Sequence, residues 1–176
     1  MHVVLLAAQS LDGRITRQAQ AGDAFTSAAD KAHFSAALRA CDACVMGRAT
    51  YEASRERLRP DRLPGLRRVV WTHTPAVYAA ECVPGVLEFT AETPAETAAR
   101  LRADGRLRCA MLGGAQVNTA WLRAGLVDEL CLTVESALFG SGTPLIGPDL
   151  EVSLRLLDTT VLAPGGPVVL RYAVQK

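Results

Sequence analysis

Two short stretches of this chain combine glycine with residue types that can hold an anion. The first is Gly47-Arg48-Ala49-Thr50, which follows an apolar run and precedes a helical one. Glycine lets backbone approach an anion, helix N-terminal amides point towards it, and arginine supplies a forked charge. The second is Gly113-Gly114-Ala115-Gln116, in the same kind of context. Together they could hold a pyrophosphate or a dinucleotide, although tight turns also use glycine for steric reasons alone.

Neither stretch is a standard nucleotide fingerprint. The Gly-x-Gly-x-x-Gly pattern of a Rossmann site is absent, and so is a Walker loop. A third strand ends at Trp71-Thr72-His73-Thr74, whose hydroxyls and imidazole could contact a phosphate or a ribose. Thr72 and Thr74 could equally begin a turn.

Two carboxylates lie near these stretches in plausible site loops. Asp30 follows Ser27 on an otherwise apolar helical face, where it could act as a proton donor in a cleft. It could also serve the helix start, for which Ser27 is a good N-cap. Asp12 sits in a Ser-Leu-Asp-Gly turn and could be a turn residue or a catalytic one.

Composition excludes several classes of function. The 176 residues are 49% hydrophobic and 21% charged, and the net charge of +1 implies no broad basic face for nucleic acid or an anionic membrane. The apolar run Val3–Ala8 is too short to span a bilayer. The cysteine count of five is odd, and Cys41-x-x-Cys44 closes a helical run, so buried structural thiols are favoured over a redox pair. We expect a cytoplasmic protein without a metal site.

The hydrophobic pattern predicts strands that alternate with helices along most of the chain. Strands are expected at 3–8, 43–46, 68–72, 109–112, 127–134, 153–162 and 168–174, and helices after Ser27 and over 49–57, 94–104 and 115–124. Residues 17–26 read as a loop over the site. The last two strands flank a Pro/Gly-rich turn like a hairpin. The sequence therefore predicts one α/β domain over 1–176, with a mostly parallel sheet and a C-terminal antiparallel hairpin.

Further motifs follow one another in the order of a known family. They are Ser10-Leu11-Asp12-Gly13-Arg14-Ile15, Leu38-Arg39 with Asp42-Ala43, Met46-Gly47-Arg48-Ala49-Thr50-Tyr51, Gly113-Gly114 with Asn118, Gly125-Leu126-Val127-Asp128-Glu129-Leu130, and Gly140-Ser141-Gly142-Thr143-Pro144-Leu145. Each is modest, but the ordered set covers nearly the whole chain. It resembles the dihydrofolate reductase superfamily, and more closely the pyrimidine-reductase domain of bacterial riboflavin biosynthesis.

This resemblance implies a three-layer α/β/α fold, NADPH as cofactor, and a homodimer paired through its sheets. The cofactor-binding residues that it implies are Ala8, Gly47, Arg48, Thr50, Thr72, His73, Gly113, Gly114, Ala115 and Gln116. The nicotinamide would lie near Ala7, Ala8 and Ile15. The hydride would pass to a small heterocycle in a cleft lined by Asp12, Asp30 and Phe34, with Asp12 and Asp30 as the catalytic residues.

Two departures from the family patterns bear on the substrate. Folate-reducing enzymes place a carboxylate-clamping arginine where this chain has Leu66, and alternation would turn Arg67 to the opposite face. Losing a bidentate charged contact weakens a dicarboxylate substrate by about 1.5–3 kcal/mol. Such enzymes also carry a tryptophan where Phe25 stands. The pyrimidine reductases usually follow the phosphate turn with Asp-x-Pro-x-Leu, which is missing here.

Three arginines occupy that stretch instead. Arg55, Arg57 and Arg59 could hold a substrate phosphate, or they could form a solvated helical face. The favoured function is an NADPH-dependent reductase of a 5-amino-6-ribosylaminopyrimidine 5′-phosphate type compound. The alternatives are reduction of a pterin and a non-catalytic NADPH-binding homologue.

Overall fold

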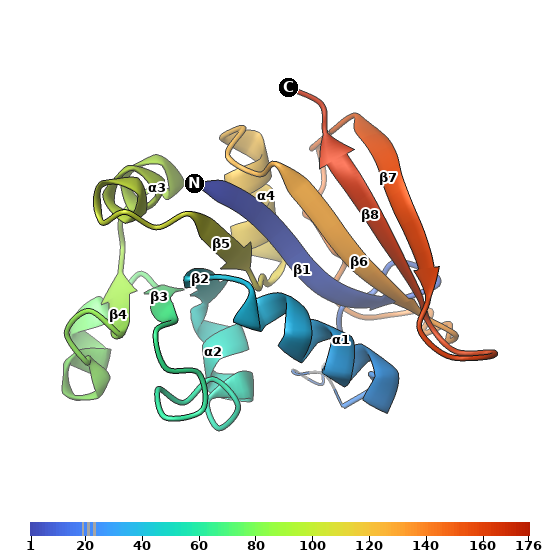
Figure 1. The fold of residues 1–176 in the computed structure, drawn as a ribbon, viewed down its shortest axis with the longest axis horizontal. Helices are drawn as coiled ribbons and strands as arrows, with labels where there is room; N and C mark the ends of the chain where they lie inside the picture. Colours follow the sequence, from blue (N-terminus) through green and yellow to red (C-terminus); the bar gives the residue numbers. More distant parts are fainter. Residues whose placement is uncertain (19, 21, 23) are drawn as a thin grey trace.

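A computed structural model, which describes residues 1–18, 20, 22 and 24–176, has an eight-stranded sheet between two layers of helices (Figure 1). The strands are β1 (His2–Ser10), β2 (Ala43–Gly47), β3 (Arg67–Trp71), β4 (Leu87–Thr90), β5 (Arg108–Met111), β6 (Glu129–Glu135), β7 (Leu154–Val161) and β8 (Val168–Val174). The helices are α1 (Ala28–Arg39), α2 (Arg48–Ser54), α3 (Pro94–Ala103), α4 (Ala115–Arg123) and the 3-10 helix η1 (Pro75–Glu81).

The strand order is β4-β3-β2-β5-β1-β6-β8-β7. Pairing is parallel from β4 to β6 and antiparallel from β6 through β8 to β7. The predicted fold class, a mostly parallel sheet that ends in an antiparallel hairpin, is therefore confirmed.

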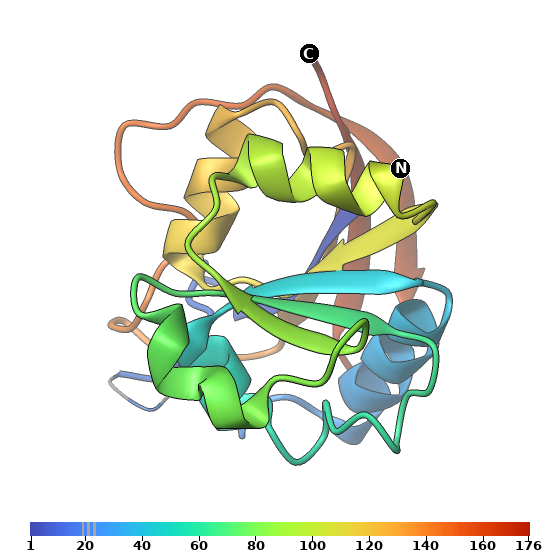
Figure 2. The ribbon, with the colours of Figure 1, turned by 90° about the vertical axis from the view of Figure 1, so that its left-hand side faces the viewer.

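The central strands are apolar because helices cover both faces of the sheet. Figure 2 shows α3 and α4 on one side of the strands and α1 and α2 on the other. Trp121 of α4, at 1% exposure, packs in the core between the sheet and the α3 and α4 side, and Leu38 of α1 and Tyr51 of α2 lie in the core on the opposite face. The sheet and the helices on its two faces therefore form three layers.

Helix boundaries follow the predicted caps. Ser27 accepts a hydrogen bond from the Asp30 amide at the start of α1. Thr93 and Glu96 form a reciprocal capping box at the start of α3, and Pro94 takes the first helical position. Gly105, at φ +74°, follows the end of α3 in the left-handed conformation that glycine tolerates.

The structure adds elements that the hydrophobic pattern does not predict. Strand β4 is only four residues long and alternates buried with half-buried positions, so its signal is weak. Helix α2 ends at Ser54 and not at Arg57, and a turn follows. Within the predicted 17–26 loop, Ala19, Ala21 and Asp23 lie outside the described residues.

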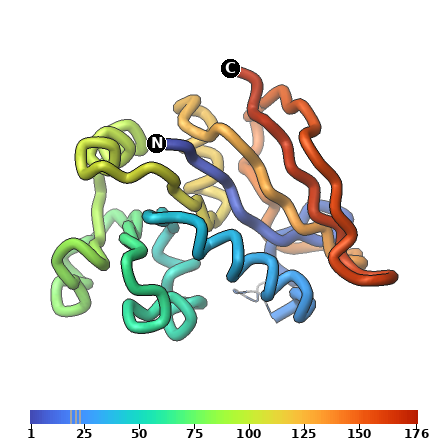
Figure 3. The backbone as a smooth tube through the Cα atoms, in the orientation of Figure 1, coloured from blue at the N-terminus to red at the C-terminus, as the bar shows by residue number. Residues whose placement is uncertain are grey.

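The parallel strands end at one edge of the sheet, and this edge carries the predicted motifs. Strand β2 ends at Gly47, β3 ends just before Thr72, and β5 leads into Gly113. The two chain termini lie together at the opposite end of the molecule (Figure 3). In the described part of the chain, no helix is long and apolar enough to cross a membrane.

The prediction of buried thiols holds for Cys44 of the Cys41-x-x-Cys44 pair, whereas Cys41 is half-buried. Cys44 is fully buried in β2, and burial raises the pKa of its thiol to about 12. Both cysteines are free thiols. A thiol that stays protonated at neutral pH is a poor redox nucleophile.

Candidate active site

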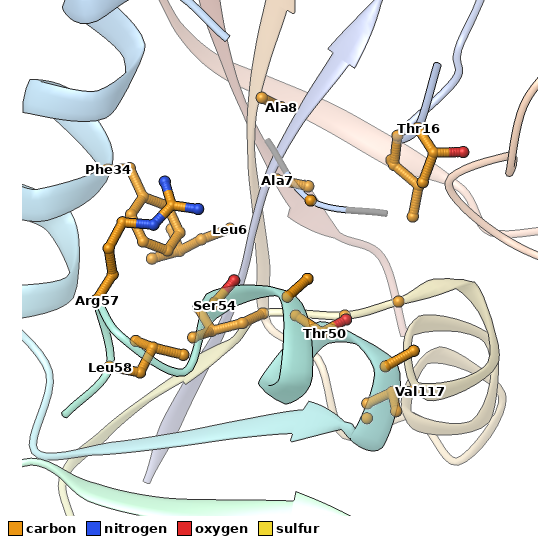
Figure 4. Close-up of a pocket in the computed structure, with 18 of the residues that line it drawn as sticks. Leu6, Ala7, Ala8, Thr16, Phe34, Thr50, Ser54, Arg57, Leu58 and Val117 are labelled. Carbon is orange, nitrogen blue, oxygen red and sulfur yellow. The ribbon is translucent and has the colours of Figure 1, made fainter. Parts of the chain in front are cut away.

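A cavity of about 900 Å³ opens at the carboxyl ends of the parallel strands. Its volume lies at the upper end of the usual range for ligand pockets. Figure 4 shows Thr50 of α2 on its floor, Val117 of α4 at one end, and Phe34 of α1 with Arg57 at the other. Thirteen of the predicted site residues line it: Ala8, Ile15, Asp30, Phe34, Gly47, Arg48, Thr50, Thr72, His73, Gly113, Gly114, Ala115 and Gln116. The remaining predicted residue, Asp12, is not part of the lining.

The two glycine turns contact each other at the cavity wall. The Gly47 amide donates to the Gly113 carbonyl at 2.7 Å. A Cβ added at Gly47 would lie 3.2 Å from Val117 Cγ2, and one added at Gly113 would lie 3.2 Å from Asn118 Oδ1. Gly113 also has φ +81°. A side chain at Gly47 would therefore be tight against Val117, and one at Gly113 would be both tight and in a strained conformation, so the two glycines leave bare backbone facing the cavity.

Arg48 lines the cavity from the start of α2. Its Nη1 donates to Glu52 Oε2 at 2.8 Å, and the Tyr78 hydroxyl donates to the other Glu52 oxygen at 2.5 Å. These hydrogen bonds lower the pKa of Glu52, the largest contribution coming from Tyr78. The half-exposed guanidinium is thus oriented while keeping donors for an anion.

Asp30 is buried at the opposite end of the cavity, with 6% of its surface exposed. Burial raises the pKa of its carboxyl group, and the nearby Glu135 carboxylate raises it further, whereas hydrogen bonds with Thr133 and Thr26 act in the other direction. Glu135 is itself held by the Ser27 amide at 2.7 Å. Because its pKa is raised, Asp30 keeps its proton to a higher pH than an exposed carboxyl group does, so it can act as a proton donor to the cavity.

Asp12 has a different environment. Its carboxylate accepts hydrogen bonds from the Ser10 hydroxyl at 2.6 Å, the Phe139 amide at 3.0 Å and the Gly140 amide at 2.8 Å. These bonds, that of Ser10 first, lower its pKa to about 2. The carboxylate thereby anchors the loop after β6. A catalytic role for Asp12 stays a prediction, since it does not face the cavity in this structure.

An Asp12→Asn variant should distinguish these two roles. The folded-state pKa of about 2 lies below the ordinary 3.8, so the ionised carboxylate stabilises the fold above about pH 4, and this contribution is lost as the pH falls through 2. The free energy of unfolding of the variant should therefore depend less on pH across this window. Denaturant titrations at several pH values measure it. An unchanged pH dependence with a large loss of kcat would instead support catalysis.

Several residues that face or support the cavity were not predicted. Glu135 and Thr133 lie two residues apart on β6 beside Asp30, and period-two alternation is the signal that could have found them. Asn118 lines the cavity and donates to the Leu145 carbonyl at 2.8 Å. This bond ties the loop after β6, which contains Leu145, to α4.

The charge of the cavity is strongly one-sided. Among the described lining residues, five are lysine or arginine and Asp30 is the single acid; the five are Lys31, Arg39, Arg48, Arg57 and Arg62. Arg48 lies at the glycine-turn end, whereas Arg57 and Arg62 belong to the segment after α2. A cavity with positive charge at two places suits ligands that carry anionic groups.

The other predicted arginines do not line the cavity. Arg55 pairs with Glu81 at 2.8 Å, and Arg59 pairs with Asp61 at 3.1 Å. Arg67 pairs with Glu88 and Asp104, which confirms that it faces away from the cavity. Leu66 is buried in the core. Neither Leu66 nor Arg67 can therefore replace the folate clamp.

Comparison with known proteins agrees with this geometry. Residues 1–168 match the family model of the RibD C-terminal domain. No curated protein matches the sequence. Among solved structures, a pyrimidine reductase-like protein from Corynebacterium diphtheriae is 19% identical with a TM-score of 0.74, and the match covers 99% of this chain and 92% of that one.

Two further structures span the wider fold family. RibD from Acinetobacter baumannii is 20% identical with a TM-score of 0.78, and the match covers 99% of this chain but 58% of that one. Dihydrofolate reductase from Enterococcus faecalis, complexed with NADP(H), is 21% identical with a TM-score of 0.70, covering 99% and 97%. These likenesses establish the dihydrofolate-reductase-like fold.

Proposed function

This chain belongs to the RibD C-terminal domain family, the reductases of riboflavin biosynthesis, and we propose that it uses NADPH to reduce a 5-amino-6-ribosylaminopyrimidine 5′-phosphate. The observation that carries the proposal is one cavity that joins two bare glycine turns to a buried carboxylic acid, with five basic residues around them. The reductases of this family use a nicotinamide cofactor. The second group of basic residues in the cavity, Arg57 and Arg62, favours a phosphorylated substrate.

The glycine-turn end fits the cofactor. At Gly47 and Gly113, where an added Cβ would be tight against Val117 or Asn118, backbone alone borders the space, and Arg48 adds an oriented cation. Thr72 and His73 lie at the same end and would contact the adenosine phosphate. When bound, NADPH supplies the hydride for the reduction.

The opposite end fits the heterocycle. Phe34 forms an apolar wall against which a flat ring can pack, and Ile15, close to Gly114, borders the space between the two ends. Asp30 can deliver a proton to the nitrogen or oxygen atom bonded to the carbon that receives the hydride. Arg57 and Arg62 lie nearby and would hold the ribose phosphate. This division assigns one anionic group to each basic end of the cavity.

The decisive assay follows NADPH absorbance with two potential acceptors. We expect turnover with the ribosylaminopyrimidine phosphate, and weak or no turnover with dihydrofolate, because Leu66 and Arg67 cannot form the folate clamp. Turnover with dihydrofolate alone would establish the pterin alternative. Tight NADPH binding without turnover of any acceptor would identify a non-catalytic homologue.

We also propose a homodimer formed through the β7 edge of the sheet. Every residue of β7 is exposed, including Leu154, Leu156 and Val161, and Figure 1 shows the β8–β7 hairpin projecting away from the helices. Long apolar edge strands favour association. Light scattering at micromolar concentration should give a dimer mass for the wild type and a monomer mass for Leu156→Glu. Leu107→Glu, at an exposed leucine far from β7, is the control. A monomeric wild type would refute the proposal.

A further inference from the structure

A buried arginine lies below the substrate end of the cavity. Arg68 of β3 is fully buried, with its strand neighbours Cys44 and Leu87 in the core on the α1 and α2 side. No ion pair of Arg68 with a carboxylate occurs within the described residues. A guanidinium without a carboxylate partner is rarely buried unless other acceptors satisfy its donors.

Those acceptors are four backbone carbonyls of one loop. We call residues 55–66, between α2 and β3, the 55–66 loop. Arg68 Nε donates to the Leu58 carbonyl at 2.5 Å, and Nη1 donates to the Leu66 carbonyl at 2.5 Å. Nη2 donates to the Arg59 carbonyl at 3.1 Å and the Leu63 carbonyl at 3.0 Å. Four separate points of the loop are thus tied to one rigid fork.

The same loop forms the wall at the substrate end of the cavity. Arg57, Leu58, Arg62 and Leu63 all line the cavity, and each lies next to or between the carbonyls that Arg68 holds. Figure 4 shows Arg57 and Leu58 on this segment, on the side of the cavity towards Phe34 of α1. Among the described residues, the loop's own backbone bonds are local, such as Arg62 amide to Arg59 carbonyl at 3.1 Å.

We propose that Arg68 is a positioning residue for the substrate, because its buried guanidinium fixes the 55–66 loop so that Arg57 and Arg62 face the substrate's phosphate. The identity of the substrate in this inference rests on the proposed function, whereas the attachment of the loop by Arg68 does not. Arg68 touches neither the cavity nor the cofactor end, so it acts only through the loop. Hydrogen bonds to carbonyls leave its positive charge in place, which adds to the positive potential at this end.

The test compares Arg68→Lys with Arg67→Lys, its neighbour on β3. Lysine keeps the charge but presents a single nitrogen that cannot reach four carbonyls in a fixed fork. We expect Arg68→Lys to raise KM for the phosphorylated substrate about 10- to 100-fold, with little change in kcat or in the Kd for NADPH. KM for the dephosphorylated ribosyl compound should change much less. Arg67→Lys disturbs ion pairs with Glu88 and Asp104 on the far side and should leave both KM values unchanged.

A second measurement tests the loop in the wild type itself. The amides of Arg62 and Leu66 should exchange slowly with deuterium, although the loop is at the surface, and should become fast in Arg68→Lys. Free-peptide exchange rates in the wild type would overturn the proposal, even if Arg68→Lys fails to fold. An equal rise in KM for both substrates, or for Arg67→Lys, would also overturn it. If no acceptor is turned over, the proposed function fails, while hydrogen exchange still decides whether Arg68 holds the loop.

Discussion

Asp30→Asn should lower turnover of the pyrimidine by about 10²- to 10⁴-fold, while NADPH binds with unchanged affinity. Asparagine keeps the size and the polarity of the buried side chain, so it can still bond with Thr133 and Thr26, but it has no acidic proton to give. The binding of NADPH is unaffected because Arg48 and the glycine turns lie at the other end of the cavity. Stopped-flow reduction rates and fluorescence titration of NADPH measure the two quantities.

The pH profile gives an independent check on the same residue. Burial and the Glu135 carboxylate raise the pKa of Asp30, so the active protonated form should disappear, and the rate should fall, as pH rises through that pKa. Glu135→Gln removes the neighbouring charge but keeps an oxygen for the Ser27 amide. It should therefore shift this fall in rate to lower pH. A profile that does not move would show that Glu135 has no influence on the proton donor.

Gly113→Ala should weaken NADPH binding by about 10- to 100-fold, equivalent to about 1.4–2.8 kcal/mol. Gly113 has φ +81°, and an added Cβ would lie 3.2 Å from Asn118 Oδ1, so the turn or the asparagine must shift. A shift of this turn also disturbs the Gly113 carbonyl, to which the Gly47 amide is bonded. Both halves of the cofactor site would therefore move together. Calorimetric titration with NADPH measures the loss.

Gly125→Ala separates the binding effect from backbone strain. Gly125 has φ +65° and nothing within 4 Å of an added Cβ, so its substitution should destabilise the fold by about 1–2 kcal/mol through conformation alone. It lies after α4 and does not line the cavity. NADPH affinity should thus stay at the wild-type value. Equal losses of affinity in both variants would mean that general destabilisation, and not the turn, explains the result.

Much of the fold could be predicted because each local signal agrees with the global one. Apolar runs such as Val3–Ala8 are buried strands, and caps such as Thr93 mark the helix starts. Strand β4 and helix η1 were missed because four alternating residues and a short 3-10 turn carry almost no periodicity. The place of β4 depends on pairing with β3, and η1 packs against β4.

The sequence by itself determined the family, the two glycine turns and the candidate proton donor Asp30, because the glycines and Arg48 follow strand ends and Asp30 follows a helix cap in a characteristic order. Only the tertiary structure decided how these residues are used. It directs Asp12 to amides of the loop after β6, although its residue type equally suits catalysis. It places Glu135 beside Asp30 and makes Arg68 the anchor of the 55–66 loop. Such roles depend on which distant backbone groups surround a side chain, and that arrangement exists only once the sheet has formed.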